Sequence, residues 1–298
     1  MSRFEHRVLA VTPHPVVESG VREFGYGRVD FDRVAKLIHC RAGIVLSQAK
    51  QDMVYSRLVR RVRALGMAQF RDYLDHLERL DTDDPELEAF TNALTTNLTS
   101  FFREPHHFEV LRDYLATLPA GRPPRIWCAA ASTGEEPYSI AMTVAEHFGR
   151  VDAPCEIVAS DIDTQVLEQG RRGVYPIDRI TALDQGLVKR WFRRGIGAMD
   201  GYCKVIEPLA RMIDFRQLNL LDSDWPLRGP FDVIFCRNVM IYFNKPTQLQ
   251  ILQKLVPLMA PDGLFIAGHS ESYLHAAELI RSCGRTVYRR AQSHGATV

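Results

Sequence analysis

The stretch CAAASTGEEPYSIAM, residues 128–142, joins a strand-like run to a helix-like run, where nucleotide-binding folds often hold their ligand. A turn that binds pyrophosphate reads G-x-G-x-x-G, because the phosphate must approach the backbone closely. This stretch contains a single glycine, and Ala129–Ala131 carry β-carbons in its place. Glu135 and Glu136 would also repel a phosphate. The turn therefore predicts a ligand that is cationic or at least free of phosphate.

A second acid, Asp161, ends the next strand-like run. An acid at that position typically accepts hydrogen bonds from ribose hydroxyls. S-adenosylmethionine fits both acids, because it carries an ammonium, a sulfonium and a ribose but no phosphate. We therefore expect Glu135 to hold the ammonium and Asp161 the ribose. Glu135 taken alone is better explained as a helix N-terminal charge that stabilises the helix dipole; Asp161 and the missing glycines reverse this in favour of the ligand.

The elements that position these acids alternate between strand and helix from residue 125 onward, which predicts an α/β fold with a mostly parallel sheet and helices on both faces. Strands are expected at 125–130, 156–160, 212–217, 231–236, 264–268 and 286–290. Ligands of such sheets bind at the carboxyl ends of the strands. That edge should carry Ser132–Glu135, Asp161, Asn219 and Arg237–Asn238.

The chain is predicted to contain an aperiodic, mobile arm over residues 1–27, an all-helical domain over 28–118, and the α/β domain over 119–298. The break LPAGRPP, residues 118–124, separates the two domains. The connection over about 173–211 is much longer than an ordinary loop between a helix and a strand. We interpret it as a small inserted subdomain with β character, placed where loops commonly carry recognition.

The composition excludes several function classes. A formal net charge of +1 provides no global field for nucleic acid or anionic membrane. The six cysteines are scattered without a C-x-x-C pair, which indicates neither zinc nor a disulfide framework. His106 and His107 are adjacent and should face different sides of a helix, away from a shared metal with Glu109, so no metal is expected. Neither a signal peptide nor an apolar span is recognisable, which predicts a cytoplasmic protein.

Six runs in this order closely resemble the CheR family, the chemotaxis protein-glutamate O-methyltransferases. They are NLTSFFREPHHF (97–108), AAASTGEEPYSIA (129–141), ASDIDTQVL (159–167), NLLD (219–222), FCRNVMIYF (235–243) and PDGLFIAGHSES (261–272). The resemblance implies a Rossmann-like class I methyltransferase sheet with an inserted β-subdomain behind a helical domain. It also implies methyl transfer from S-adenosylmethionine to glutamate side chains of chemoreceptors, giving methyl esters and S-adenosylhomocysteine.

The resemblance carries site residues onto matching positions. It implies that the cofactor contacts Asn97, Thr99, Arg103, Glu135, Asp161, Asn219, Leu220, Arg237 and Asn238. It further implies a reaction centre made of Arg103, Arg237 and Tyr242. A glutamate is already ionised at pH 7, so the reaction needs orientation and desolvation rather than a general base. Tyr242 could instead be ordinary packing beside Phe243.

Two features suggest how a receptor is reached. In residues 51–66, Arg57, Arg60 and Arg63 are expected opposite an apolar stripe of Val54, Leu58, Val62 and Leu65. They form either a solvated helix face or a basic ridge that docks on the acidic helical domain of a chemoreceptor. In the insert, the spacing of Gly195, Gly197 and Gly201 resembles members that bind a receptor's C-terminal peptide by strand addition. The simpler interpretation is a glycine-rich hairpin turn.

Other functions are weaker. A non-catalytic module that senses S-adenosylmethionine and binds receptors is the main alternative, yet Arg103, Arg237 and Tyr242 are all present. A nucleic-acid methyltransferase would need a base-stacking loop where the sequence reads CRNVMIYF. An oxidoreductase lacks its glycine fingerprint, and His269-Ser270-Glu271 lacks the G-x-S-x-G elbow of a hydrolase.

Overall fold

The computed structural model describes residues 3–4, 22–119 and 121–291. These form two compact units, which divide between Thr96 and Asn97. The sequence predicts this boundary at residue 118, and the structure corrects it. Helix α5 (His106–Ala116) packs its buried Phe108 and Leu111 into the core of the α/β unit rather than into the helical one. The predicted arm, residues 1–27, lies largely outside the described residues.

The helical unit contains α1 (Arg28–Ala42), a 3-10 turn η1 (Gln48–Lys50), α2 (Gln51–Ala64), α3 (Phe70–Leu77) and α4 (Pro85–Leu94). Helix α4 begins as its sequence dictates, because the Asp84 side chain accepts a hydrogen bond of 2.8 Å from the Glu86 backbone and Pro85 fits the first turn. Buried Glu86 in turn accepts from Arg61 and from the Tyr73 hydroxyl, which ties three helices together.

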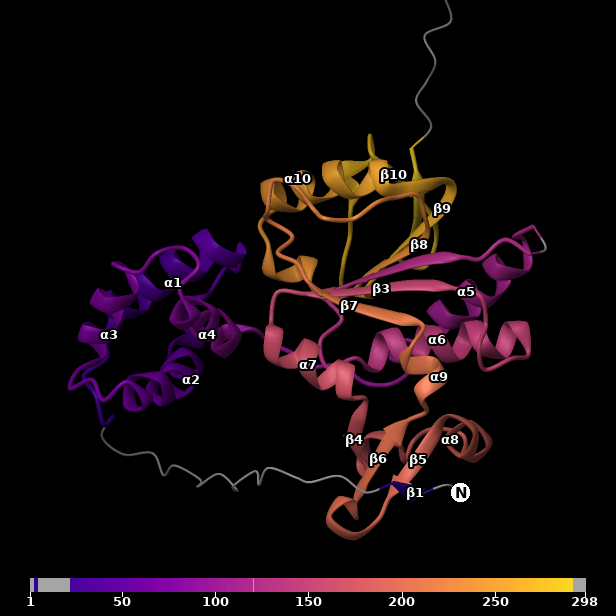
Figure 1. Cartoon of the computed structure of the whole chain (residues 1–298). Helices are drawn as coiled ribbons and strands as arrows, with labels where there is room; N and C mark the ends of the chain where they lie inside the picture. Colours follow the sequence, from indigo (N-terminus) through magenta and orange to yellow (C-terminus); the bar gives the residue numbers. More distant parts are fainter. Residues whose placement is uncertain (1–2, 5–21, 120, 292–298) are drawn as a thin grey trace, which may run out of the picture. The chain divides into compact units, whose positions relative to one another are not determined.

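The α/β unit is built on a seven-stranded sheet of order β10-β11-β9-β8-β2-β3-β7 (Figure 1). Its strands are β2 (Arg125–Ala129), β3 (Glu156–Asp161), β7 (Ile213–Gln217), β8 (Phe231–Cys236), β9 (Met259–Ala267), β10 (Ile280–Gly284) and β11 (Val287–Arg290). The five strands from β9 to β7 are parallel, and β10 and β11 pair antiparallel at one edge. The predicted α/β fold is confirmed, and β10 is the strand that the sequence did not reveal.

Helices cover both faces of this sheet. The further helices are α6 (Glu135–Phe148), α7 (Thr164–Arg172), α9 (Glu207–Ala210), α10 (Lys245–Leu255) and the 3-10 turns η4 (Met240–Tyr242), η5 (Val256–Leu258) and η6 (Leu274–Ala276). Alternate residues of β2 enter different cores: Ile126 and Cys128 pack with α5 and α6, whereas Trp127 packs with α10. The strands therefore read as continuous apolar runs, as buried parallel strands do.

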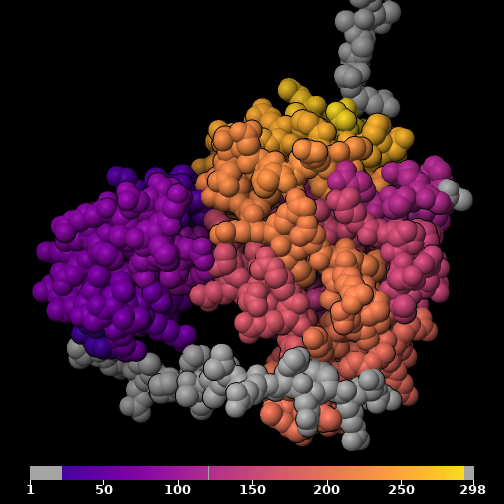
Figure 2. Space-filling model, viewed as in Figure 1, coloured from indigo at the N-terminus to yellow at the C-terminus, as the bar shows by residue number. Residues whose placement is uncertain are grey.

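The insert, within the predicted range 173–211, contributes three strands to a small sheet of order β1-β5-β6-β4. Its elements are β4 (Val174–Pro176), η2 (Ile177–Ile180), α8 (Gln185–Trp191), β5 (Phe192–Gly195), η3 (Gly197–Met199) and β6 (Tyr202–Val205). Strand β1 (Arg3–Phe4) pairs parallel with the outer edge of β5. Figures 1 and 2 show the insert at the opposite end of this unit from α10.

The insert's glycines have a structural reason. A β-carbon on Gly195 would lie 2.0 Å from the Met199 carbonyl oxygen, and Gly197 and Gly201 adopt left-handed φ values of 59° and 85°. The connection between β5 and β6 thus requires glycine with or without a ligand. Among the described helices, none is long and apolar enough to cross a membrane.

Candidate functional site

The turn between β2 and α6 is backbone-strained. Ala130 and Ser132 have positive φ values of 64° and 49°, although neither is glycine. Gly134 has a φ of 97°, and a β-carbon there would lie 2.8 Å from the Tyr175 hydroxyl. That hydroxyl donates a hydrogen bond of 2.8 Å to the Thr133 carbonyl, which anchors the insert on this turn. The single glycine of the motif, Gly134, therefore occupies a position where the packing leaves no room for a side chain.

Asp161 lies at the end of β3, as predicted. Its carboxylate accepts hydrogen bonds from the Ser132 backbone at 2.8 Å and from the Asp163 backbone at 3.0 Å. Burial raises the pKa of Asp161 to about 6, although these backbone donors act in the opposite direction. The carboxylate oxygens retain lone pairs, and they can accept further hydrogen bonds from a ribose.

Glu135 and Glu136 are adjacent on α6, yet they face different partners. The Glu135 side chain is 0% exposed, accepts a hydrogen bond of 2.6 Å from the Thr133 hydroxyl, and forms an ion pair with Arg179. Arg179 lies on η2 of the insert, and sequence analysis did not identify it. Glu136 instead forms an ion pair with Arg237 beneath the turn. The two acids predicted to exclude phosphate therefore bind different arginines, Glu135 that of the insert and Glu136 the one that follows β8.

The segment between residues 97 and 104 passes over the same strand ends. The Asn97 side-chain amide donates to Asp163 at 2.8 Å, and the Asn97 carbonyl accepts from the Ser132 hydroxyl at 3.0 Å. The Thr99 carbonyl accepts from Arg179 at 3.0 Å. The predicted cofactor residues Asn97 and Thr99 thus lie beside the loops that follow β2 and β3.

Arg237 follows β8, and its side chain is completely buried. Its Nη1 donates to Glu136, its Nη2 donates to the Arg103 carbonyl at 2.6 Å, and Glu104 lies 3.4 Å from Nη2. Within the described residues, Nε has no hydrogen-bond partner. The resemblance places Arg237 in the reaction centre. In the structure its Nη2 holds the segment that carries Arg103, while its Nη1 binds Glu136.

Two more predicted reaction-centre residues are partly accessible. Arg103 is half-buried, and its Nη1 donates to the Leu98 carbonyl at 2.9 Å. Tyr242 is half-buried at the end of η4. The loop after β9 supports η4, because Glu271 accepts hydrogen bonds from the backbones of Met240 at 2.9 Å and Gly268 at 2.6 Å. Glu271 is thus committed to shaping the loop.

The remaining predicted cofactor residues follow β7 and β8. Asn219 accepts a hydrogen bond of 3.0 Å from the Leu221 backbone, and Leu220 is buried. Asn238 has a positive φ of 58° and packs closely against Gly268, where a β-carbon would lie 2.3 Å from the Asn238 side-chain nitrogen. All the strands concerned are parallel, so these residues share one edge of the sheet with Glu135 and Asp161.

The two adjacent histidines differ from the expectation that they diverge. Their ring centroids are 4.0 Å apart, and possible ligand atoms of Glu104, His106 and His107 lie within 4.8 Å of one another. The acid beside them is thus Glu104 rather than Glu109. Glu104 already accepts from the His269 side chain at 3.0 Å, and the nearby Arg237 charge disfavours a cation. We therefore assign no metal to this cluster.

Comparison with known proteins decides the family. Residues 97–289 match the CheR methyltransferase, SAM binding domain, and residues 29–95 match the CheR methyltransferase, all-alpha domain. The chain belongs to the CheR methyltransferase family. Its CheR relatives include chemotaxis protein methyltransferase 2 of Pseudomonas aeruginosa, which is 52% identical over 94% of this chain and 99% of that protein. Chemotaxis protein methyltransferase of Escherichia coli is 51% identical over 87% of this chain and 89% of that protein.

The cofactor of this CheR chain is therefore S-adenosylmethionine, as the acids predict. The residues present fit it. Buried Glu135 offers a carboxylate for the ammonium, and Asp161 offers one for the ribose. The strained turn contacts both acids at the same edge of the sheet, since the Thr133 hydroxyl donates to Glu135 at the start of α6 while the Ser132 backbone donates to Asp161 at the end of β3. When bound, the cofactor supplies a methyl group that is already electrophilic on its sulfonium.

Proposed function

We propose that this chain methylates glutamate side-chain carboxylates of chemoreceptors, with S-adenosylmethionine as methyl donor. The observation that carries this proposal is the pair of acids, Glu135 and Asp161, at the carboxyl edge of a CheR-family sheet. A glutamate acceptor is already ionised at neutral pH, which matches a site where the nearby arginines serve to orient rather than to remove a proton. Because the proposed substrate is the cytoplasmic helical domain of a chemoreceptor, the enzyme would act in the cytoplasm.

Arg103 is the arginine best placed to meet the substrate. It is half-buried, and within the described part of the chain its side chain makes one hydrogen bond, to the Leu98 carbonyl, whereas Arg237 is buried among Glu136, Glu104 and the Arg103 carbonyl. A guanidinium can bind one carboxylate oxygen and leave the other free to attack the methyl group. Arg237 then positions Arg103 through its backbone, and Tyr242 contributes a hydroxyl that helps to orient the carboxylate.

The direct test uses methyl-labelled S-adenosylmethionine and receptor-containing membranes, followed by mild alkali. Volatile labelled methanol is the expected product, because carboxyl methyl esters hydrolyse in base. Label that survives alkali would indicate another acceptor, and no transfer despite cofactor binding would favour the non-catalytic sensing module. Arg103→Ala should abolish most of the volatile label, and its affinity for S-adenosylhomocysteine, measured beside the wild type, separates loss of cofactor binding from loss of methyl transfer.

The arginines of α2 provide a candidate surface for the receptor's helical domain. Arg60 is exposed, Arg63 pairs with Glu23, and Arg57 donates to the carbonyls of Ala93 and Thr95 at the end of α4. Arg57 therefore also stabilises the helical unit. The docking test should use Arg60→Glu, which should raise KM for receptor while it leaves cofactor affinity unchanged. A loss of cofactor affinity would contradict docking.

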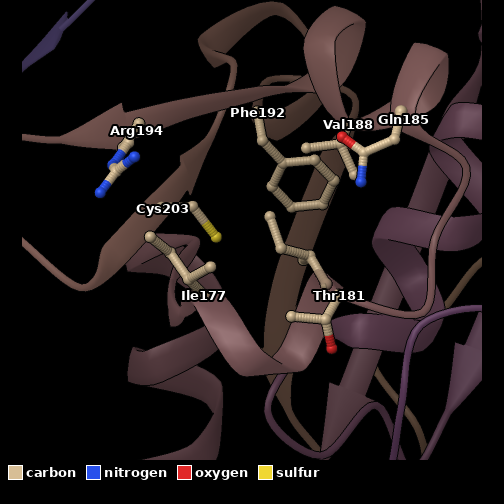
Figure 3. Close-up of a pocket in the computed structure, with 8 residues that line it drawn as sticks. Ile177, Thr181, Gln185, Val188, Phe192, Arg194 and Cys203 are labelled. Atoms are coloured by element: carbon tan, nitrogen blue, oxygen red, sulfur yellow. The ribbon is translucent and has the colours of Figure 1, made fainter.

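The insert provides a second candidate surface, for a receptor's C-terminal peptide. It holds a cavity of about 190 Å³ (Figure 3). The lining residues are Ile177, Ile180, Thr181, Gln185, Val188, Phe192, Arg194 and Cys203. Strand addition at the outer edge of β5 would have to replace Arg3–Phe4, which pair there in this structure. Titration with receptor tail peptides tests this tether, and absence of binding at millimolar peptide would contradict it.

A further inference from the structure

The cation that faces Glu135 in this structure belongs to the protein itself. Arg179 Nη2 donates to Glu135 Oε1 and also to the Thr99 carbonyl at 3.0 Å. The Arg179 side chain is 37% exposed, whereas Glu135 is completely buried beneath it. A ligand ammonium that binds Glu135 must therefore arrive next to this guanidinium, and the guanidinium belongs to the functional site.

Arg179 is held at this place by the fold of the insert. It lies on η2 directly after β4, and Tyr175 of β4 donates to the Thr133 carbonyl in the turn that precedes Glu135. The same turn supplies the Thr133 hydroxyl to the other Glu135 oxygen at 2.6 Å. The insert is thus attached to the cofactor edge of the sheet through two groups, the Tyr175 hydroxyl and the Arg179 guanidinium.

We propose that Glu135 and Arg179 together form a receptor for the zwitterionic amino-acid end of S-adenosylmethionine. The ammonium binds Glu135, and the carboxylate binds Arg179. This inference rests on the cofactor of the proposed function and adds a residue and a contact to it. Among the described residues, the hydrogen bonds of Arg179 all use Nη2, so the N–H groups of Nε and Nη1 remain for a carboxylate.

The charges require such a group. Apart from Arg179, the ligand would meet the Thr99 carbonyl and the Glu135 carboxylate, which are acceptors and would repel a ligand carboxylate. An acid–base pair matches a zwitterion without leaving net charge behind, because the internal ion pair is exchanged for two ion pairs with the ligand. Arginine suits the role, since its fork binds carboxylates in a fixed geometry.

The test measures binding of three ligands by calorimetry to the full chain, without receptor. S-adenosylhomocysteine carries both charged groups, its analogue without the α-carboxylate carries only the ammonium, and 5′-methylthioadenosine carries neither. Arg179→Gln should weaken S-adenosylhomocysteine binding about tenfold, as expected for a lost charge-assisted hydrogen bond, and should leave the neutral nucleoside unchanged. It should also remove the preference of the wild type for the ligand with the carboxylate.

Arg190→Gln is the matched control. Arg190 also lies on the insert and pairs with a glutamate of α6, Glu146, away from the cofactor edge. It should bind all three ligands as the wild type does, and thermal unfolding should show both variants folded.

Tighter binding of both ammonium ligands by Arg179→Gln would overturn the proposal, since Arg179 would then be a counter-ion that the ligand displaces. Equal weakening of all three ligands would overturn it too and would indicate a purely structural role. A wild type that binds none of them would contradict the cofactor itself, which is a different failure.

Discussion

Two glutamate–arginine pairs begin at neighbouring residues of α6 and end in different environments. Glu136 pairs with Arg237, and both side chains are almost completely buried, at 10% and 0% exposure. Glu135 pairs with Arg179, whose side chain is 37% exposed. Breaking the first pair leaves a charge without water, whereas in the second pair Arg179 reaches the surface and can exchange partners. One pair therefore builds the site, and the other is available to a ligand.

Removal of the buried arginine should have the largest effect. Arg237→Ala leaves Glu136 buried and frees the Arg103 carbonyl, so the free energy of unfolding should fall by about 3–5 kcal/mol in urea denaturation. The surface pair Arg190–Glu146 provides the control, and Arg190→Ala should cost about 1 kcal/mol or less. Similar losses for the two variants would contradict the scaffold role of Arg237.

The strained turn between the two pairs should be the next most sensitive place. Gly134→Ala combines a left-handed φ with a β-carbon 2.9 Å from the Gly170 Cα, so it should cost about 3 kcal/mol of stability. Gly149 at the other end of α6 is also left-handed but has open space around it, and Gly149→Ala should cost about 1 kcal/mol. Equal midpoints in urea would show that the packing of the insert on the turn is unimportant.

Substitutions of the two adjacent acids should affect different properties, cofactor affinity in one case and the free energy of unfolding in the other. Glu135→Gln should weaken S-adenosylhomocysteine binding by about 2 kcal/mol while it changes the free energy of unfolding little, because Arg179 can turn toward water. Glu136→Gln should do the reverse and lower mainly the stability. Calorimetry and urea denaturation on both variants check this. A stability loss confined to Glu135→Gln would contradict the assignment of Glu136 as the structural acid and Glu135 as the ligand-binding acid.

The smallest expected effect is a pH dependence at the ribose contact. The ionised Asp161 accepts hydrogen bonds and the protonated form does so less well, so cofactor affinity should be lost as pH falls through a pKa of about 6. Affinity at pH 5 should be about tenfold below that at pH 7.5. Burial lowers the pKa of His107 to about 3, so this histidine stays neutral throughout. Asp161→Asn should bind weakly and without this dependence.

The strands of the large sheet and the position of Asp161 at the end of β3 were predictable, because both depend on local patterns. Apolar runs ending in Asp161 and Arg237 marked β3 and β8, and the long connection marked the insert. The boundary at Thr96 was missed because α5 has the same amphipathic pattern whichever unit it packs against. The run RSCG at the antiparallel edge was too mixed in polarity to show β10.

The partners of the acids could not be predicted, because they come from distant segments. Arg179 lies 44 residues beyond Glu135, and Arg237 lies 101 residues beyond Glu136. Two consecutive glutamates give no sign of which will face a buried arginine. The preceding Thr133, which donates to Glu135, and the arginine-bearing turn after β4 were visible in the sequence, yet only folding brings them together.

A crystal structure of the protein with S-adenosylhomocysteine tests the central claim most directly. We expect the ligand ammonium within hydrogen-bonding distance of Glu135 and the ribose hydroxyls on Asp161, with the Glu136–Arg237 pair unchanged. A nucleoside bound away from both acids would contradict the assignment of this edge of the sheet as the cofactor site.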